Sequence, residues 1–125
     1  MNLWRLLILG YAGLYTVLAL AIHADNVKAG YPAPFILCSA MAQACVTIGV
    51  IVFGFGREAV VAKLWKRLFP FLILELCIGI TLDATVPRDY NPGTHGLAWM
   101  ANLLFNLWLA TPAYYFNFKI ARYGG

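Results

Sequence analysis

Four long apolar stretches constrain this chain more than any other feature of its sequence. They cover about 3–22, 31–55, 64–82 and 97–118. Each is close to the roughly 20 residues that a tilted helix needs to cross about 30 Å of hydrocarbon. The runs are continuous and lack the polar and apolar alternation that a membrane β-barrel requires. We therefore predict an all-α integral membrane protein, a bundle of four transmembrane helices formed as a single domain by residues 1–125.

The composition favours the same architecture. Of the 125 residues, 62% are hydrophobic and 11% are charged, whereas charged residues make up about 25% of an ordinary soluble domain. Once the four spans are assigned, short connections account for the rest of the chain, so no separate soluble domain is expected. The lipid bilayer is the first partner that the sequence predicts.

The basic residues are distributed unequally along the predicted topology. Of the nine, Lys28 and Arg88 fall in the first and third connections, and the other seven fall at the N-terminus, in the second connection and in the tail. Lys and Arg concentrate on the cytoplasmic side of membrane proteins, so both termini are expected inside, an N-in, C-in orientation. Because orientation accounts for the net charge of +4, no nucleic-acid partner is predicted. We expect a bacterial inner (plasma) membrane location.

Glu75 is an ionisable group inside the otherwise apolar third stretch. A charged side chain at the membrane centre costs about 3 kcal/mol on insertion scales, so such residues usually face protein or mark a pathway. Asp83 lies on roughly the same side of the predicted helix, about 12 Å further along at 1.5 Å per residue, near the outer boundary. The sequence thus predicts a ligand or proton site centred on Glu75.

Amide side chains in two other spans reach similar depths. Gln43 and Asn106 fall near the same midplane as Glu75, and Asn102 falls with Asp83 in the outer third. Asn102 and Asn106 are four residues apart and therefore share one helix face. We expect these polar faces to turn inward and form a track open to the outside. The alternative is that they hydrogen-bond to one another and serve only to hold the helices together.

No motif in the sequence predicts a cofactor. His23 and His95 both fall at the outer boundary, where they could meet with Asp83, and two histidines and a carboxylate can hold a transition metal. Their spacing does not require such a site, so they are weak candidates and no metal is predicted. The three cysteines form no CxxC pair and are expected to act as small apolar packing residues.

Aromatic residues are expected mainly on the outer surface. Trp4, Tyr11 and Tyr15 lie largely off the small-residue face of the first helix, so we expect them to meet lipid or a neighbouring subunit. Trp65 lies in the basic second connection and is expected at headgroup level, where Trp is enriched. Pro70 follows and predicts a kink where the connection leads into the third helix.

These features favour a small membrane protein that binds or conducts a small solute, proton or lipid-like ligand at Glu75. A small apolar or cationic ligand fits this hypothesis, and a homo-oligomer or a place in a larger membrane complex is expected. One alternative is a non-catalytic assembly subunit. Another is a membrane enzyme in which Glu75 or Asp83 acts as general acid on an apolar substrate.

The predicted orientation can be tested by cysteine accessibility. In a background without the native cysteines, Lys63→Cys should be protected from a membrane-impermeant thiol reagent in intact cells, whereas Arg88→Cys should be labelled, because the two positions lie on opposite sides of the membrane. Labelling after membrane permeabilisation is the control for both. An Arg88→Cys variant that reacts only after permeabilisation would overturn the orientation.

Overall fold

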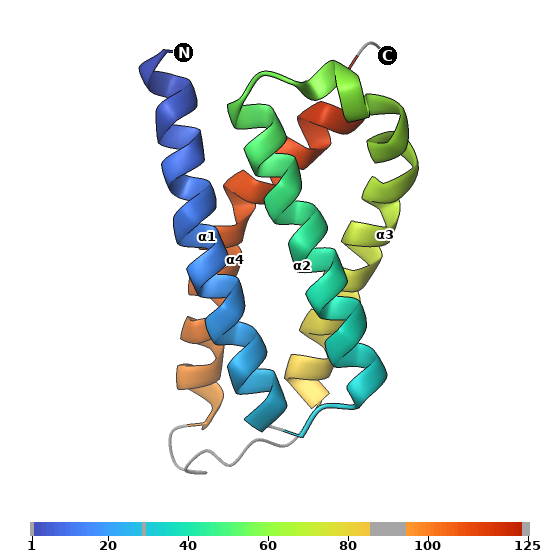
Figure 1. The fold of residues 1–125 in the computed structure, drawn as a ribbon. Helices are drawn as coiled ribbons and strands as arrows, with labels where there is room; N and C mark the ends of the chain where they lie inside the picture. The colour runs from blue at the N-terminus through green and yellow to red at the C-terminus, as the bar shows by residue number, and fades with distance from the viewer. Residues whose placement is uncertain (1, 29, 86–94, 124–125) are drawn as a thin grey trace.

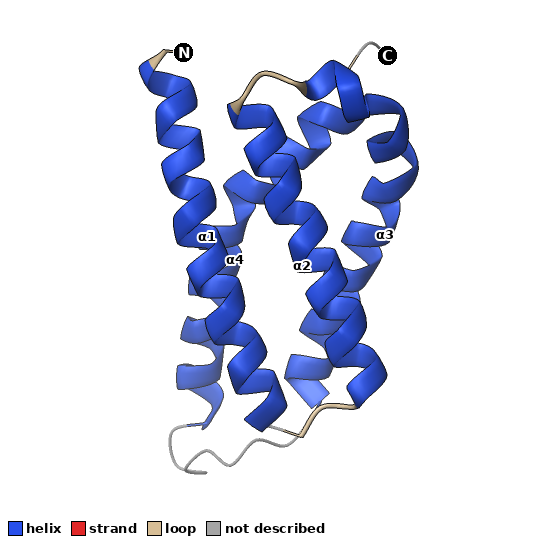
Figure 2. Cartoon of the chain, viewed as in Figure 1, coloured by secondary structure: helices blue, strands red, loops and turns tan. Residues whose placement is uncertain are grey.

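The computed structural model is all-helical and describes residues 2–28, 30–85 and 95–123. The side chains of 82–85, 95–99 and 102 lie outside the described part of the chain. Helices α1 (Leu3–Lys28), α2 (Ala33–Gly54), α3 (Glu58–Thr85) and α4 (His95–Ala121) follow in order, and no strand occurs among the described residues (Figure 2). The prediction of an all-α chain with four helices is confirmed.

Successive helices run in opposite directions, so the two termini lie at the same end as the connection between α2 and α3 (Figure 1). In the described part of the chain, α2 packs against each of the other three helices and α4 also packs against α1 and α3. Helices α1 and α3 do not pack against each other along their backbones there, and a single ion pair between Arg5 and Glu58 joins their first turns. The α2–α4 pair thus separates them, which leaves space for side chains from all four helices to converge.

Three of the four described helices, α1, α3 and α4, extend beyond the predicted apolar spans. Helix α1 continues to Lys28, and α3 begins at Glu58, before the predicted start at 64, because a helix can continue through polar residues that end a hydrophobic run. Pro70 lies inside α3, which curves in its first half (Figure 1). The Trp65 side chain is 4% exposed, because the helical start of α3 turns it into the bundle, and its predicted depth at headgroup level stays a prediction.

The turn between α2 and α3 is fixed by its backbone and by Arg5. Gly56 has a positive φ of 70°, and the N–H groups of Gly56 and Arg57 donate to the carbonyls of Phe53 and Val52, the pairing of a Schellman C-cap. Arg5 donates to the Phe53 carbonyl and forms a 2.9 Å ion pair with Glu58 in the first turn of α3. One side chain of α1 therefore holds the end of α2 and the start of α3.

A close-packed core occupies the half of the bundle nearest the termini. It combines the first half of α1 and the middle of α3 with the second halves of α2 and α4. Its fully buried members include Val46, Val50, Leu72 and Ala113. Phe53 and Phe116 stack with ring centroids 4.9 Å apart.

Asn117 on α4 is buried with 0% exposure in this core and has hydrogen bonds on both ends of its amide. Its Oδ1 accepts from Trp65 Nε1 of α3 at 2.7 Å, and its Nδ2 donates to the carbonyls of Val46 at 3.0 Å and Ala113 at 2.7 Å. A Cβ at Gly49 of α2 would overlap the amide, so only glycine leaves room for it. One polar side chain thus connects α2, α3 and α4.

The Pro112 break in α4 is bridged by a tyrosine. An unbroken helix would pair the N–H of Ala113 with the carbonyl of Leu109. Instead, the Ala113 N–H donates to the Tyr11 hydroxyl at 3.1 Å, and that hydroxyl donates to the Leu109 carbonyl. Insertion of a side chain into the helical ladder is an established cause of a kink. The sequence prediction that Tyr11 faces outward is therefore wrong.

Among the described residues, α1 and α2 are the helices long and apolar enough to cross a membrane by length and composition, with mean hydropathies of 1.9 and 2.2 over their most apolar windows. Helix α3 carries the basic residues that precede Pro70, which lowers its apolar content. The length and composition of the described helices thus support two of the four predicted membrane spans.

The Asn117 network makes Gly49 a sensitive position. Gly49→Ala should displace the amide and lower the free energy of unfolding by about 2 kcal/mol or more, because buried polar groups lose hydrogen bonds. Gly13→Ala on α1 is the matched control, since a Cβ there meets nothing within 4 Å. Unfolding in mixed micelles, followed by circular dichroism, measures both. Equal stability of the Gly49→Ala variant and the control would contradict the described packing.

Candidate functional site

A partly open cavity of about 140 Å³ lies in the half of the bundle away from the termini. Side chains from all four helices line it. It extends from Glu75 and Tyr114 near the middle of the bundle toward the connection between α1 and α2, where Tyr31 and Phe35 pack edge to face with centroids 5.5 Å apart. The polar and aromatic lining residues are Tyr15, Asp25, Asn26, Tyr31, Phe35, Ser39, Gln43, Glu75, Asn106 and Tyr114.

Two polar interactions organise the polar part of the lining. The Tyr15 hydroxyl of α1 donates a hydrogen bond to Gln43 Oε1 of α2 at 2.6 Å, and the Ser39 hydroxyl, one turn earlier in α2, lies near enough to the Glu75 carboxyl group of α3 to interact with it. Ser39 and Gln43 share one face of α2 because they are four residues apart. Tyr15 is 5% exposed, so its position is fixed by the packing around it.

Negative charge dominates the lining. Glu75 and Asp25 are its ionisable carboxyl groups, and none of the described residues that line the cavity is Lys, Arg or His. Glu75 is half-buried. Unlike Glu58, which pairs with Arg5, it is not within ion-pair distance of a basic side chain in the described part of the chain. A carboxylate away from bulk water is costly without a partner of opposite charge, so the cavity favours a proton or a cation at Glu75.

The Tyr114 hydroxyl is the second polar group of the cavity with unused hydrogen-bonding capacity. It is buried and has no hydrogen-bond partner among the described residues, although Glu75 lies within electrostatic range of it. A buried hydroxyl usually has a partner. A ligand or water molecule in the cavity could supply one, because Tyr114 lines the cavity beside Glu75.

The structure brings together three of the residues predicted for the site. Gln43, Glu75 and Asn106 all line the cavity, each from a different helix. Asn102 and Asp83 have side chains outside the described residues, so their part in the site stays a prediction. The functional role of all five residues likewise remains a prediction.

Of the two weak histidine candidates, the structure describes the side chain of His23 alone. His23 is not among the residues that line the cavity, and both of its ring nitrogens are buried without a hydrogen-bond partner in the described part of the chain. The side chains of His95 and Asp83 lie outside the described residues. No group of three or more His, Cys, Asp or Glu side chains that could hold a metal occurs among the residues that are described.

Sequence reasoning missed the aromatic part of the site. Tyr15 is predicted to face lipid or another subunit, yet it is buried against Gln43, and Tyr114 is not among the predicted site residues. The positions of Tyr15 and Tyr114 in the sequence fit an ordinary membrane helix, so they did not indicate a site. Ser39 carried a usable signal, because it lies one turn from Gln43 on the same face of α2.

No family model, curated protein or solved structure matches this chain.

The open cavity makes Glu75 chemically accessible. Dicyclohexylcarbodiimide, an apolar reagent for carboxyl groups, should modify Glu75 several-fold faster than Glu58, because Glu75 lines a cavity without basic residues and Glu58 is paired with Arg5. Peptide mass spectrometry of the treated protein in micelles quantifies both sites. Glu75→Gln is the control for assignment of the label. Preferential modification of Glu58 would contradict an accessible Glu75.

Proposed function

We propose that this chain is a four-span integral membrane protein that binds or conducts a small solute, proton or lipid-like ligand at the cavity around Glu75. The observation that carries the proposal is the convergence of Glu75, Gln43 and Asn106 from three helices on one cavity. Small-molecule sites are typically concave and mostly apolar, with a few polar groups that converge. The Glu75 cavity has this composition.

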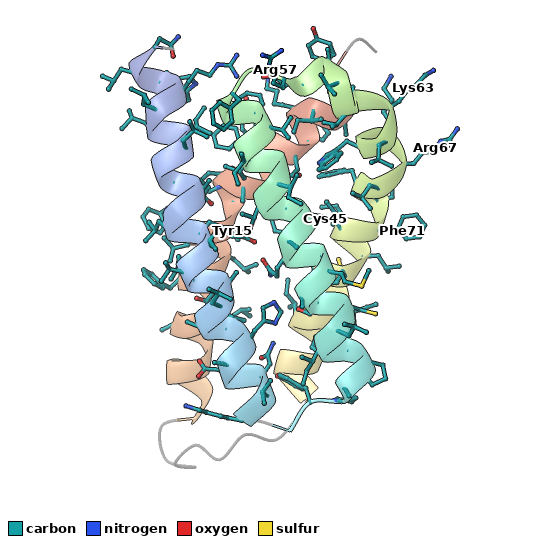
Figure 3. All side chains as sticks on the ribbon, in the orientation of Figure 1. Tyr15, Cys45, Arg57, Lys63, Arg67 and Phe71 are labelled. Carbon is teal, nitrogen blue, oxygen red and sulfur yellow. The ribbon has the colours of Figure 1, made fainter. Side chains whose placement is uncertain are left out.

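The outer surface of the helices supports a membrane location. Large apolar side chains are exposed on every helix, among them Leu20 at 66%, Leu37 at 63%, Phe71 at 67% and Trp108 at 70%. Phe71 projects away from the bundle (Figure 3). Apolar exposure on this scale suits contact with lipid or with other membrane helices and would favour aggregation in water. Helices α1 and α2 also have the length and composition of spans.

The placement of basic residues supports an N-in, C-in orientation in a bacterial inner membrane. Arg57, Lys63 and Arg67 lie at the end of the bundle that carries both termini (Figure 3). Basic residues at one end favour the cytoplasmic side for that end. The close-packed core would then lie in the inner half of the membrane, and the cavity would lie in the outer half.

A comparison between two polar residues favours a ligand site over structural bonding at Glu75. Asn117 is fully buried and its amide is satisfied by three protein groups, as expected of a residue that holds helices together. Glu75 is half-buried, borders a cavity and lacks a basic partner among the described residues. A carboxyl group that served only packing would leave a desolvation cost with little compensation.

Reconstitution tests the proposal through proton flux. In liposomes that contain the wild-type chain, an inside-negative membrane potential should drive protons inward and acidify the lumen at a rate that depends on pH. Glu75→Gln should abolish this proton flux while the protein stays folded. Asn117 is not substituted in this test because it maintains the core. Tyr115→Phe is the matched control, since Tyr115 is exposed and does not line the Glu75 cavity.

The opposite result favours the assembly subunit. Identical pH profiles for wild-type and Glu75→Gln liposomes would remove Glu75 from proton conduction. If Glu75 instead holds helices or subunits together, Glu75→Gln should be nearly silent and Glu75→Leu should weaken association, since glutamine keeps much of the hydrogen bonding and leucine does not. Sedimentation velocity of the three proteins in micelles measures that association.

A further inference from the structure

We propose that the ligand of the Glu75 cavity is a small organic monocation, an ammonium group on an apolar body about the size of one aromatic ring. This inference rests on the proposed function, because it names the ligand class of the same cavity. Three properties of the lining support it: its charge, its apolar and aromatic surface, and the unused hydrogen-bonding capacity beside Glu75.

The charge of the lining selects against anions. Both ionisable side chains of the lining that carry formal charge, Glu75 and Asp25, are acidic. The described lining contains no basic side chain that could neutralise them. The Ser39 hydroxyl lies near Glu75, but a neutral group does not balance the carboxylate charge. A monocation balances the charge of the half-buried Glu75 carboxylate, where water provides little screening, whereas the exposed Asp25 stays in contact with solvent.

The remaining lining favours an organic cation over a metal ion. Hard cations such as Ca²⁺ take six to eight oxygen ligands, and Mg²⁺ takes six in a near-octahedral arrangement. Among the described residues, no cluster of three or more acidic, His or Cys side chains is present, and much of the cavity wall is aliphatic. The larger aliphatic side chains are those of Leu18, Ile22, Leu76, Ile80, Leu103, Leu107 and Leu109.

Aromatic rings add a second source of attraction for a cation. The rings that line the cavity are those of Tyr15 in α1, Tyr31 in the connection before α2, Phe35 in α2 and Tyr114 in α4. A cation near the face of such a ring is attracted by the ring quadrupole, most strongly where water is excluded. The same rings supply apolar contact area for the body of the ligand.

The Tyr114 hydroxyl is expected to distinguish a primary from a quaternary ammonium group. Its buried hydroxyl has no partner among the described residues and lies within electrostatic range of Glu75. A primary ammonium can donate one N–H to the Glu75 carboxylate and another to the Tyr114 hydroxyl oxygen. A quaternary ammonium has no N–H and can form neither hydrogen bond, although it retains the attraction to the carboxylate.

Isothermal titration calorimetry of the full chain in nanodiscs can test the inference with three probes that share one ring. Benzylammonium should bind the wild type, and Glu75→Gln should weaken that binding about tenfold or more, because a charge-assisted hydrogen bond is lost. Benzyl alcohol should bind the wild type more weakly than benzylammonium does and equally well to the variant. Benzoate should bind more weakly than either, because the cavity is acidic. Empty nanodiscs correct for partition into lipid.

A second variant tests the hydrogen bond to Tyr114. Tyr114→Phe should weaken benzylammonium binding several-fold and leave benzyltrimethylammonium binding unchanged. Tyr115→Phe is the matched control, since Tyr115 is exposed and lies outside the Glu75 cavity, and it should change neither affinity. Thermal unfolding of each variant checks that the fold is retained.

Several outcomes would overturn the cation inference. They are tighter binding of benzyl alcohol or benzoate than of benzylammonium, an affinity for benzylammonium that Glu75→Gln does not change, and no binding of any probe. The first leaves the proposed function standing with a different ligand class. The proposed function is tested separately, by whether Glu75→Gln abolishes proton flux in liposomes. Its failure is therefore distinguishable from failure of the cation inference.

Discussion

The structure depends most on the buried amide of Asn117. Its two ends connect Trp65 of α3, Val46 of α2 and Ala113 of its own helix, and Gly49 provides the space that the amide occupies. In surroundings without water, an amide that lost these partners would carry a large desolvation cost. This requirement fixes the rotation of three helices at one end of the bundle.

Close packing at that end is compatible with an open site at the other. Tyr11 bridges the interrupted ladder of α4 at Pro112, so the helix can bend there without leaving Ala113 N–H unpaired. Beyond the bend, α1 and α3 remain separated by the α2–α4 pair, and the Glu75 cavity lies among the four helices. The bundle thus combines a rigid half, which positions the helices, with a half that has room for a ligand.

Much of the arrangement follows from patterns that are local in the sequence. The number of helices could be predicted because each apolar run has the length of a helix, and the common depth of Gln43, Glu75 and Asn106 followed from counting residues along alternating spans. The buried positions of Tyr15 and Trp65 could not be predicted in this way. Tyr and Trp are also common at membrane–water interfaces, so the residue type does not predict burial. Whether either is buried depends on which neighbouring helix offers a polar partner.

The sequence by itself determined the four helices, their alternating directions and the concentration of basic residues at one end, because hydrophobic length and charge act on each segment separately. The tertiary structure decided which faces meet. Asn117 and Asn106 are both amides on α4, yet one is enclosed by three hydrogen bonds and the other lines a cavity. That difference arises from the space and partners that other helices provide, which no single helix encodes.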